Sequence, residues 1–206
     1  MKRLLIILLI LFMPVSLWAA PNDEEVTDSG MESWTDANDL TNWSEYKEGA
    51  CTINQESSVV HSGDYSCRFD IDATGKISIY QNVSLIAGRT YYLIIWNKAS
   101  ATPSSSYWTL QNNTSNNYLQ ADLVSWGASV NNKTFNQSTV WDDDEWTFTA
   151  ETTAEYRFEI IRNTHSKSLY FDDVSIKEMW QGQVNSVVSP LYIDGIKHPA
   201  AVDGIN

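Results

Sequence analysis

The feature that most constrains the fold is an alternation of apolar and polar residues with a period of two. It recurs in short segments between residues 80 and 161, which are separated by turn residues such as Ala87-Gly88. Successive side chains of a β-strand point to opposite faces, whereas an amphipathic helix needs a period of 3.6 residues. No window of a dozen residues has a convincing helical period. We therefore predict an all-β chain, an antiparallel β-sandwich of the jelly-roll kind.

The same alternation assigns side chains to the interior or the surface. Tyr91 and Ile95 share one face of their segment, whereas Trp96 has the opposite parity and is predicted to face outward. Trp108 and Trp146 fall on inward positions and are predicted to lie in the core.

Polar stretches between these segments are predicted to be loops. Residues 111–117 and 130–138 are rich in Asn, Ser and Thr and are interpreted as long polar loops. The acidic run Asp142-Asp143-Asp144-Glu145 is interpreted as a solvated polar turn, because consecutive carboxylates repel one another and stay hydrated.

The first twenty residues differ from this pattern. A basic start, Lys2-Arg3, precedes the apolar run Leu4–Met13, which is too short to span a bilayer. Residues 1–20 are predicted to be a signal peptide that is cleaved after Ala19 or Ala20. A short N-terminal membrane anchor is the alternative. We expect a secreted protein, extracellular or periplasmic.

The rest of the chain is predicted to contain one domain. Residues 21–178 suit a single β-sandwich by their length. Residues 179–206 contain two Gly-bearing apolar pieces and are interpreted as a C-terminal linker or as the start of a truncated following segment.

The charge of the chain narrows the choice of partners. It carries 13 basic and 26 acidic residues, a formal net charge of −13. Such a surface repels nucleic acid and anionic lipid. We therefore expect no nucleic acid and no membrane as partners, and we expect a monomer that suits neutral ligands or divalent cations.

The two cysteines, Cys51 and Cys67, are predicted to form a disulfide, since an even cysteine count in an exported protein favours a bridge. Their mean position lies in a probable hairpin at residues 59–63, so they would face each other across adjacent strands. Such a bridge would contribute about 3 kcal/mol. A pair of buried thiols is the alternative.

Two adjacent carboxylates, Asp172 and Asp173, interrupt the apolar segment Ser168–Ile176, which is otherwise typical of a β-strand. Buried carboxylates are costly unless they are paired or bind a cation. The segment therefore suggests a metal site at the edge of a sheet.

Several motifs, taken in order, resemble the cellulase-associated carbohydrate-binding modules of families 4 and 9 and their relatives in family 22. The resemblance extends from Gly30 to Ile176 and implies a galactose-binding-domain-like jelly roll. The matching motifs are Gly30-Met31-Glu32, followed by Trp43; His61-Ser62-Gly63-Asp64-Tyr65-Ser66; Ala87–Lys98; Trp141–Thr149; and Leu169–Ile176.

The resemblance implies a structural calcium ion. By position, the ligands would be the carboxylates of Glu32 and Asp172 and the backbones of Ser62 and Tyr65. Calcium prefers such a mixture of carboxylate and carbonyl oxygens. A hydrogen-bonded cluster without a metal is the alternative.

The resemblance also implies a carbohydrate-binding groove across one sheet, where pyranose rings stack on aromatic side chains and polar groups bind hydroxyls. Tyr118 and Gln120 occupy positions where the family often has groove residues. A further groove aromatic of the family is not matched, because residues 72–76 contain none. The remaining candidates are predicted from outward parity: Trp96, Tyr107, Gln111, Arg157 and Glu159.

No catalytic residues are predicted. The three histidines have no metal-like spacing, and no nucleophile elbow or phosphate loop occurs. A carboxylate pair of Glu159 and Asp122 is the alternative that the sequence leaves open. We expect a non-catalytic module that binds a polysaccharide such as β-glucan or xylan, with a possible tethered glycoside hydrolase. The alternatives are a structural or adhesive sandwich and an accessory fragment of a hydrolase.

Overall fold

The computed structural model describes residues 23–71, 75–101, 106–136, 138–163 and 167–179, together with the backbone of 192–193 and 196–197. The predicted signal peptide, residues 1–20, lies outside the described residues, as do Asp72–Thr74 and most of the predicted C-terminal linker. No helix occurs in the described part, which therefore contains no helix that could cross a membrane.

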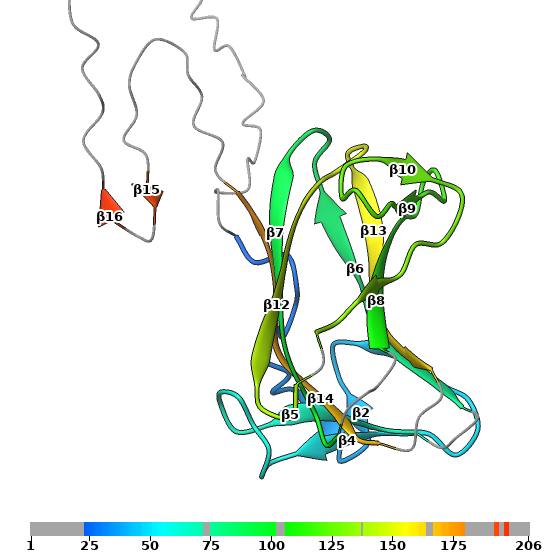
Figure 1. The fold of residues 1–206 in the computed structure, drawn as a ribbon, viewed down its shortest axis with the longest axis vertical. Helices are drawn as coiled ribbons and strands as arrows, with labels where there is room; N and C mark the ends of the chain where they lie inside the picture. Colours follow the sequence, from blue (N-terminus) through cyan, green and yellow to red (C-terminus); the bar gives the residue numbers. More distant parts are fainter. Residues whose placement is uncertain are drawn as a thin grey trace, which may run out of the picture.

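Two antiparallel sheets pack face to face (Figure 1). We call the seven-stranded sheet the front sheet and the five-stranded sheet the back sheet. The order of the front sheet is β10 (Trp126–Gly127), β9 (Tyr118–Leu119), β8 (Ser106–Asn112), β13 (Ala154–Asn163), β6 (Lys76–Leu85) and β3 (Ser44–Lys47), with β11 (Lys133–Thr134) also paired to β8. The order of the back sheet is β12 (Asp142–Thr149), β7 (Thr90–Ala99), β14 (Leu169–Glu178), β5 (Ser66–Asp70) and β4 (Thr52–Glu56).

Two short hairpins accompany the sandwich. One pairs β1 (Trp34–Asp36) with β2 (Asp39–Leu40), and the other pairs β15 (Tyr192–Ile193) with β16 (Ile196–Lys197). Every strand pairing among the described residues is antiparallel. The predicted all-β class and the predicted antiparallel sandwich are therefore confirmed.

The core lies between the sheets and is built by the predicted alternation. In β7, buried residues alternate with half-buried ones along the whole strand. Trp108 of the front sheet is fully buried and packs edge-on against Trp146 of the back sheet, with ring centroids 5.1 Å apart. Phe135 joins this contact from the loop after β11. Burying a side chain such as that of Phe135 stabilises the fold by roughly 1.5–3 kcal/mol.

The predicted disulfide is wrong: Cys51 and Cys67 are buried thiols that are not bonded to each other. In the β4–β5 hairpin, Cys67 pairs with Gln55. Cys51 lies four residues before Gln55, a separation of about 13 Å along a strand. A disulfide requires α-carbons about 4.4–6.8 Å apart.

The acidic run is part of a strand, so its interpretation as a polar turn is also wrong. Asp142–Glu145 forms the first half of β12 and pairs with β7. Asp144 has the inward parity of Trp146, and its carboxylate accepts hydrogen bonds from Asn97 Nδ2 at 2.8 Å and from the backbone N–H of Asn136. These partners offset the cost of burial, which raises the pKa of Asp144.

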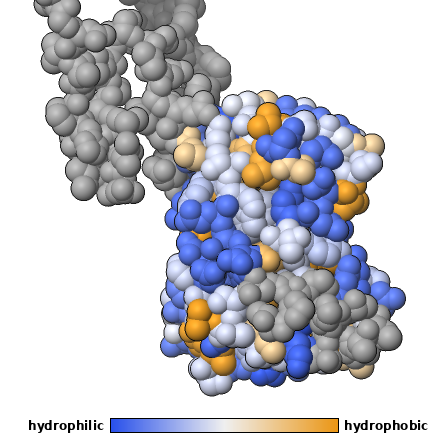
Figure 2. Space-filling model, viewed as in Figure 1, coloured by the Kyte–Doolittle hydropathy of each residue, from blue (hydrophilic) through white to orange (hydrophobic). Residues whose placement is uncertain are grey.

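The second predicted loop contains unexpected structure. Within residues 130–138, Lys133 and Thr134 form β11, and both Lys133 and Phe135 are buried. Of the first predicted loop, residues 111–117, Gln111 and Asn112 belong to β8, and residues 113–117 form the loop that follows it. The surface in the view of Figure 2 is mainly hydrophilic to intermediate, with small, separate hydrophobic patches.

Candidate functional site: the outward face of the front sheet

A row of polar and aromatic side chains crosses four strands on the outward face of the front sheet. Arg157 of β13 pairs with Asn82 of β6 on one side and with Gln111 of β8 on the other. Gln111 also pairs with Tyr118 of β9. Residues directly opposite each other on antiparallel strands share a face. We call Tyr118, Gln111, Arg157 and Asn82 the upper row.

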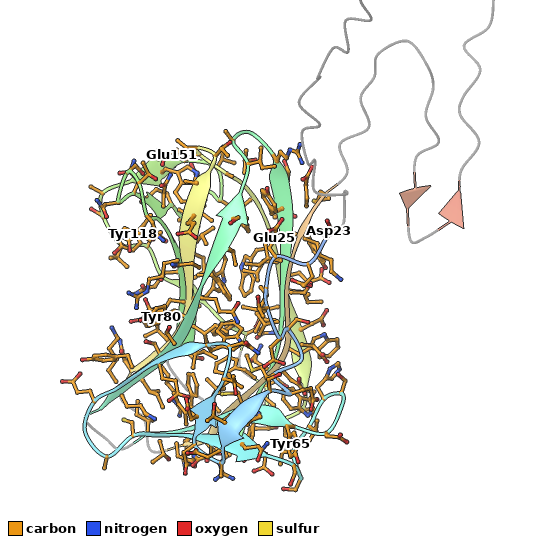
Figure 3. All side chains as sticks on the ribbon, turned by 180° about the vertical axis from the view of Figure 1, so that it is seen from behind. Asp23, Glu25, Tyr65, Tyr80, Tyr118 and Glu151 are labelled. Carbon is orange, nitrogen blue, oxygen red and sulfur yellow. The ribbon has the colours of Figure 1, made fainter. Side chains whose placement is uncertain are left out.

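A middle row lies two residues further along each strand. Glu159 of β13 pairs with Thr109 of β8 and with Tyr80 of β6. Tyr80 also pairs with Ser44 of β3. Figure 3 shows Tyr118 and Tyr80 on the same side of the molecule, away from Asp23 and Glu25.

A lower row follows with the same spacing. It contains Tyr107, Ile161, Ser78 and Tyr46. Tyr46 is 46% exposed, and the ammonium of Lys76 lies 5.5 Å from the centre of its ring.

The structure thus brings five of the predicted carbohydrate-binding residues to one face, as their parity predicts. They are Tyr107, Gln111, Tyr118, Arg157 and Glu159. Their role in binding stays a prediction. Tyr80 was missed, although the alternation of Leu85, Val83 and Gln81 already places it on the outward side of β6.

Arg157 contacts both neighbours in the middle row. Its guanidinium carbon lies 3.7 Å from the centre of the Tyr80 ring. Its Nη2 lies 3.3 Å from Oε1 of Glu159. The positive charge at the centre of this face is therefore paired with a negative one.

Tyr107 is held by a neighbour at the edge of the face. Asn163 donates a hydrogen bond from Nδ2 to the Tyr107 hydroxyl at 2.9 Å. Burial is the main cause that raises the pKa of Tyr107, so its hydroxyl stays protonated at neutral pH and keeps its hydrogen for donation.

Tyr118 stands on an anchored loop. The amide nitrogen of Gln120 donates to the carbonyls of Tyr118 at 2.7 Å, Ser129 at 3.1 Å and Gly127 at 3.4 Å. The side-chain amide of Gln120 therefore holds β9 and β10 together. This structural role competes with its predicted role in the groove.

Lys133 supports the same loop from the interior. Its ammonium donates to the carbonyls of Leu119 and Asn131 and lies 5.3 Å from the centre of the Trp108 ring. Burial lowers the pKa of Lys133 to about 8. Nothing in the sequence distinguishes this lysine, since it lies in an Asn- and Thr-rich segment that predicts solvent exposure.

The chemistry of the face suits a neutral, hydroxyl-rich ligand. Tyrosine rings offer apolar surfaces with a polar tip, and amide, guanidinium and carboxylate groups around them supply both donors and acceptors. No group on the rows has the geometry of a nucleophile beside a base.

Trp96 does not lie on this face, so the structure does not bring it together with the other predicted binding residues. It lies on β7 of the back sheet, between Asp143 and Asp172. The ring of His61 stacks on it with centroids 3.7 Å apart, and His61 Nδ1 lies 2.6 Å from Asp173 Oδ2. Outward parity was predicted correctly, but parity does not say to which sheet a strand belongs.

The residues predicted to bind calcium converge at one place on the back sheet. Asp172 Oδ2 accepts hydrogen bonds from the backbone N–H groups of His61 at 2.9 Å and Ser62 at 3.2 Å. Glu32 Oε1 accepts them from Asp64 at 2.9 Å and Tyr65 at 3.3 Å. We call the contacts of Asp172 and Glu32 with residues 61–65 the carboxylate clamp.

The clamp requires a glycine at its centre. Gly63 has φ +66°, and a β-carbon there would lie 1.8 Å from Glu32 Oε1. An L-residue would therefore be strained and would also collide with the carboxylate. The close approach explains why the turn contains Ser62-Gly63.

The carboxylates of the clamp fit a calcium ion in their donor chemistry. Each carboxylate oxygen can accept more than one hydrogen bond. Asp172 Oδ1 accepts one, from the backbone N–H of Asp173. Burial raises the pKa of Asp172 to about 6, a cost that a bound cation would offset. By the resemblance, Glu32 and Asp172 with the carbonyls of Ser62 and Tyr65 would hold the ion. The contacts present in the structure are made by the N–H groups of this loop, and among the described residues no group of three or more Asp, Glu, His or Cys is placed to hold a metal ion.

The carboxylate pair that the sequence left open for catalysis is not supported by its environment. Asp122 is exposed and accepts hydrogen bonds from the N–H groups of Val124 and Ser125, which lower its pKa. A general acid for glycoside cleavage needs a raised pKa instead. Glu159 is paired with Arg157.

Comparison with known proteins places the fold. No family model and no curated protein matches the chain. Among solved structures, the family 61 carbohydrate-binding module TmCBM61, solved with β-1,4-galactotriose, has a TM-score of 0.54 at 15% identity, over 76% of this chain and 99% of that one. A family 4 carbohydrate-binding module has a TM-score of 0.52 at 17% identity, over 75% and 99%.

A further match is the enzymatically active domain of tailspike protein 4 from bacteriophage CBA120, with a TM-score of 0.58 at 10% identity. It covers 76% of this chain and 21% of the tailspike chain, so the present chain spans about a fifth of that protein. At these identities the matches define the fold. The protein has the β-sandwich jelly roll of carbohydrate-binding modules, as the sequence motifs predicted.

Proposed function

We propose that the protein is a secreted, non-catalytic glycan-binding module. The observation that carries this proposal is the outward face of the front sheet, where the upper row sets an aromatic ring, an amide and a guanidinium side by side across neighbouring strands. A polysaccharide chain would lie across these strands, stacking on Tyr118 and exchanging hydrogen bonds with the side-chain amides of Gln111 and Asn82.

The charge of the protein supports a neutral glycan, such as β-glucan, xylan or galactan. The chain has a formal net charge of −13, and Glu159 neutralises Arg157 on the face itself. An anionic polysaccharide would meet long-range repulsion from the net negative charge of the chain. Binding of this kind does not chemically alter the polysaccharide. We therefore further propose that the module serves to hold an attached enzyme or surface close to the polysaccharide.

Affinity electrophoresis against soluble β-glucan, xylan, galactan and mannan tests the proposal. We expect at least one polysaccharide to retard the protein. Tyr118→Ala should weaken that retardation by roughly five- to thirtyfold in affinity, the usual cost of truncating an aromatic anchor.

Trp96→Ala is the matched control, since it removes an aromatic ring from the back sheet. It should leave the retardation unchanged at a temperature where circular dichroism shows the variant to be folded. Migration unaffected by every polysaccharide would refute the proposal, and an equal loss in both variants would move the site away from the front sheet.

A further inference from the structure

Tyr80 occupies the centre of the proposed binding face. It pairs with Glu159 on one side and with Ser44 on the other, between the upper row and the lower row. A sugar chain that crosses the face from Tyr118 on β9 towards the exposed ring of Tyr46 on β3 would pass over Tyr80 on β6.

The ring of Tyr80 is covered on one side. Arg157 is its diagonal neighbour, and long side chains reach across such diagonals. With its guanidinium carbon 3.7 Å from the ring centre, Arg157 lies in van der Waals contact with the ring. It occupies the position that the apolar face of a pyranose would take.

The cover is held weakly. The ion pair with Glu159 spans 3.3 Å, and the Arg157 side chain is 35% exposed. Exposed cation–π contacts and exposed ion pairs are among the weaker interactions of a folded protein.

In its position over the Tyr80 ring, Arg157 also lacks one hydrogen bond. Its Nε is buried and has no hydrogen-bond partner among the described residues. A buried donor without an acceptor is unfavourable. The cross-strand neighbours Gln111 and Asn82 carry amide oxygens, as the rim of a sugar carries hydroxyl oxygens, so a displaced guanidinium would have acceptors nearby.

We propose that Tyr80 is a stacking subsite for a pyranose ring, closed by Arg157 in the free protein and opened when a glycan displaces the guanidinium. This inference rests on the proposed glycan binding. Arg157 then acts as a specificity-determining residue, because only ligands that gain more from the Tyr80 ring than Arg157 loses will bind there.

A closed subsite lowers the apparent affinity by the fraction of molecules that are open. Removing a cover of this strength should therefore raise the affinity about three- to tenfold. The experiment measures affinity for the panel of neutral polysaccharides with wild type, Arg157→Ala, Tyr80→Ala and the double variant. We expect Arg157→Ala to bind more tightly than wild type, and we expect no such gain when Tyr80 is also replaced.

Arg68→Ala is the matched control, since it makes the same change of charge on β5 of the back sheet, where Arg68 pairs with Glu56 and Asp70. It should bind as wild type does. Thermal melting of every variant confirms that the folded proteins are compared.

The outcomes separate this inference from the proposed function. If wild type binds and Arg157→Ala binds equally or more weakly, the cover is refuted while glycan binding stands. A gain that persists in the Tyr80→Ala background, or appears in Arg68→Ala, also refutes it. Binding by Arg157→Ala alone supports the cover but refutes glycan binding by the wild type. If no protein binds, both proposals are overturned.

Discussion

At the scale of single residues, Glu25 shows how burial makes stability depend on pH. Its pKa is raised to about 7, first by burial and then by the nearby carboxylates of Glu178, Asp23 and Glu24, while Arg89 opposes the shift. The backbone N–H of Glu25 is bound to the carbonyl of Ile176, so the side chain is held beside the end of β14.

The sign of the pH effect follows from this raised pKa. Between pH 4.5 and about 7 the folded state binds the Glu25 proton more tightly than the unfolded state does. Its contribution to stability is therefore full below pH 4.5 and is lost as the pH rises through 7. Glu25→Gln should stabilise the protein by about 1 kcal/mol at pH 8 and leave it unchanged at pH 4.5.

Thermal melting at the two pH values measures this difference. Glu48→Gln is the control, because it removes the same charge from an exposed position. It should show no change with pH relative to wild type. Equal effects of Glu25→Gln at both pH values would contradict the assignment of the shift to burial.

At the scale of elements, register decides what the strands bring together. The pairing of Thr52 with Asp70 and of Glu56 with Ser66 centres the β4–β5 hairpin on His61. The midpoint between the two cysteines lies two residues earlier in the sequence than the centre of the hairpin. Because an offset of the midpoint counts twice across a hairpin, the residue opposite Cys67 lies four residues after Cys51.

A thiol titration tests this register. Without reductant, denatured protein should yield two thiols per chain, and native protein should react slowly because both cysteines are buried. Burial raises the pKa of Cys67 and so removes the reactive thiolate. Reductant should leave the melting temperature unchanged. A yield below two thiols would show that a bridge forms.

The sequence predicts the sandwich well because side-chain alternation reports burial directly. It places Trp108 inward, and it places Arg157 and Glu159 outward together. Alternation carries no information on which strands are neighbours, so it predicts that Trp96 faces outward but not that its strand belongs to the back sheet. Hydrogen bonds that make a buried polar group tolerable, such as that of Asn97 to Asp144, depend on tertiary contacts and are invisible in the sequence.

At the scale of the whole molecule, the two sheets have different tasks. The front sheet presents the proposed binding face, whereas the back sheet carries the carboxylate clamp. Through Asp172 and Glu32 the clamp connects the start of the described chain, the loop at residues 61–65 and β14. These contacts between segments far apart in the sequence attach the N-terminal segment and the loop to the back sheet.

Removal of calcium tests whether the clamp also holds an ion. A ligand that binds only the folded state stabilises it, by about 2.7 kcal/mol at a hundred times its dissociation constant. We expect chelation to lower the melting temperature of the wild type by roughly 5–10 °C, given the size of the domain. Added calcium should restore it.

Two variants make this measurement specific to the clamp. Glu32→Gln should melt at the same temperature with and without chelator, because it lacks one of the two predicted carboxylate ligands. Asp64→Asn removes a charge from an exposed position of the same loop and should keep the full response to chelator. If chelation leaves the wild type unchanged, backbone N–H groups alone balance Asp172 and Glu32, and the clamp forms without an ion.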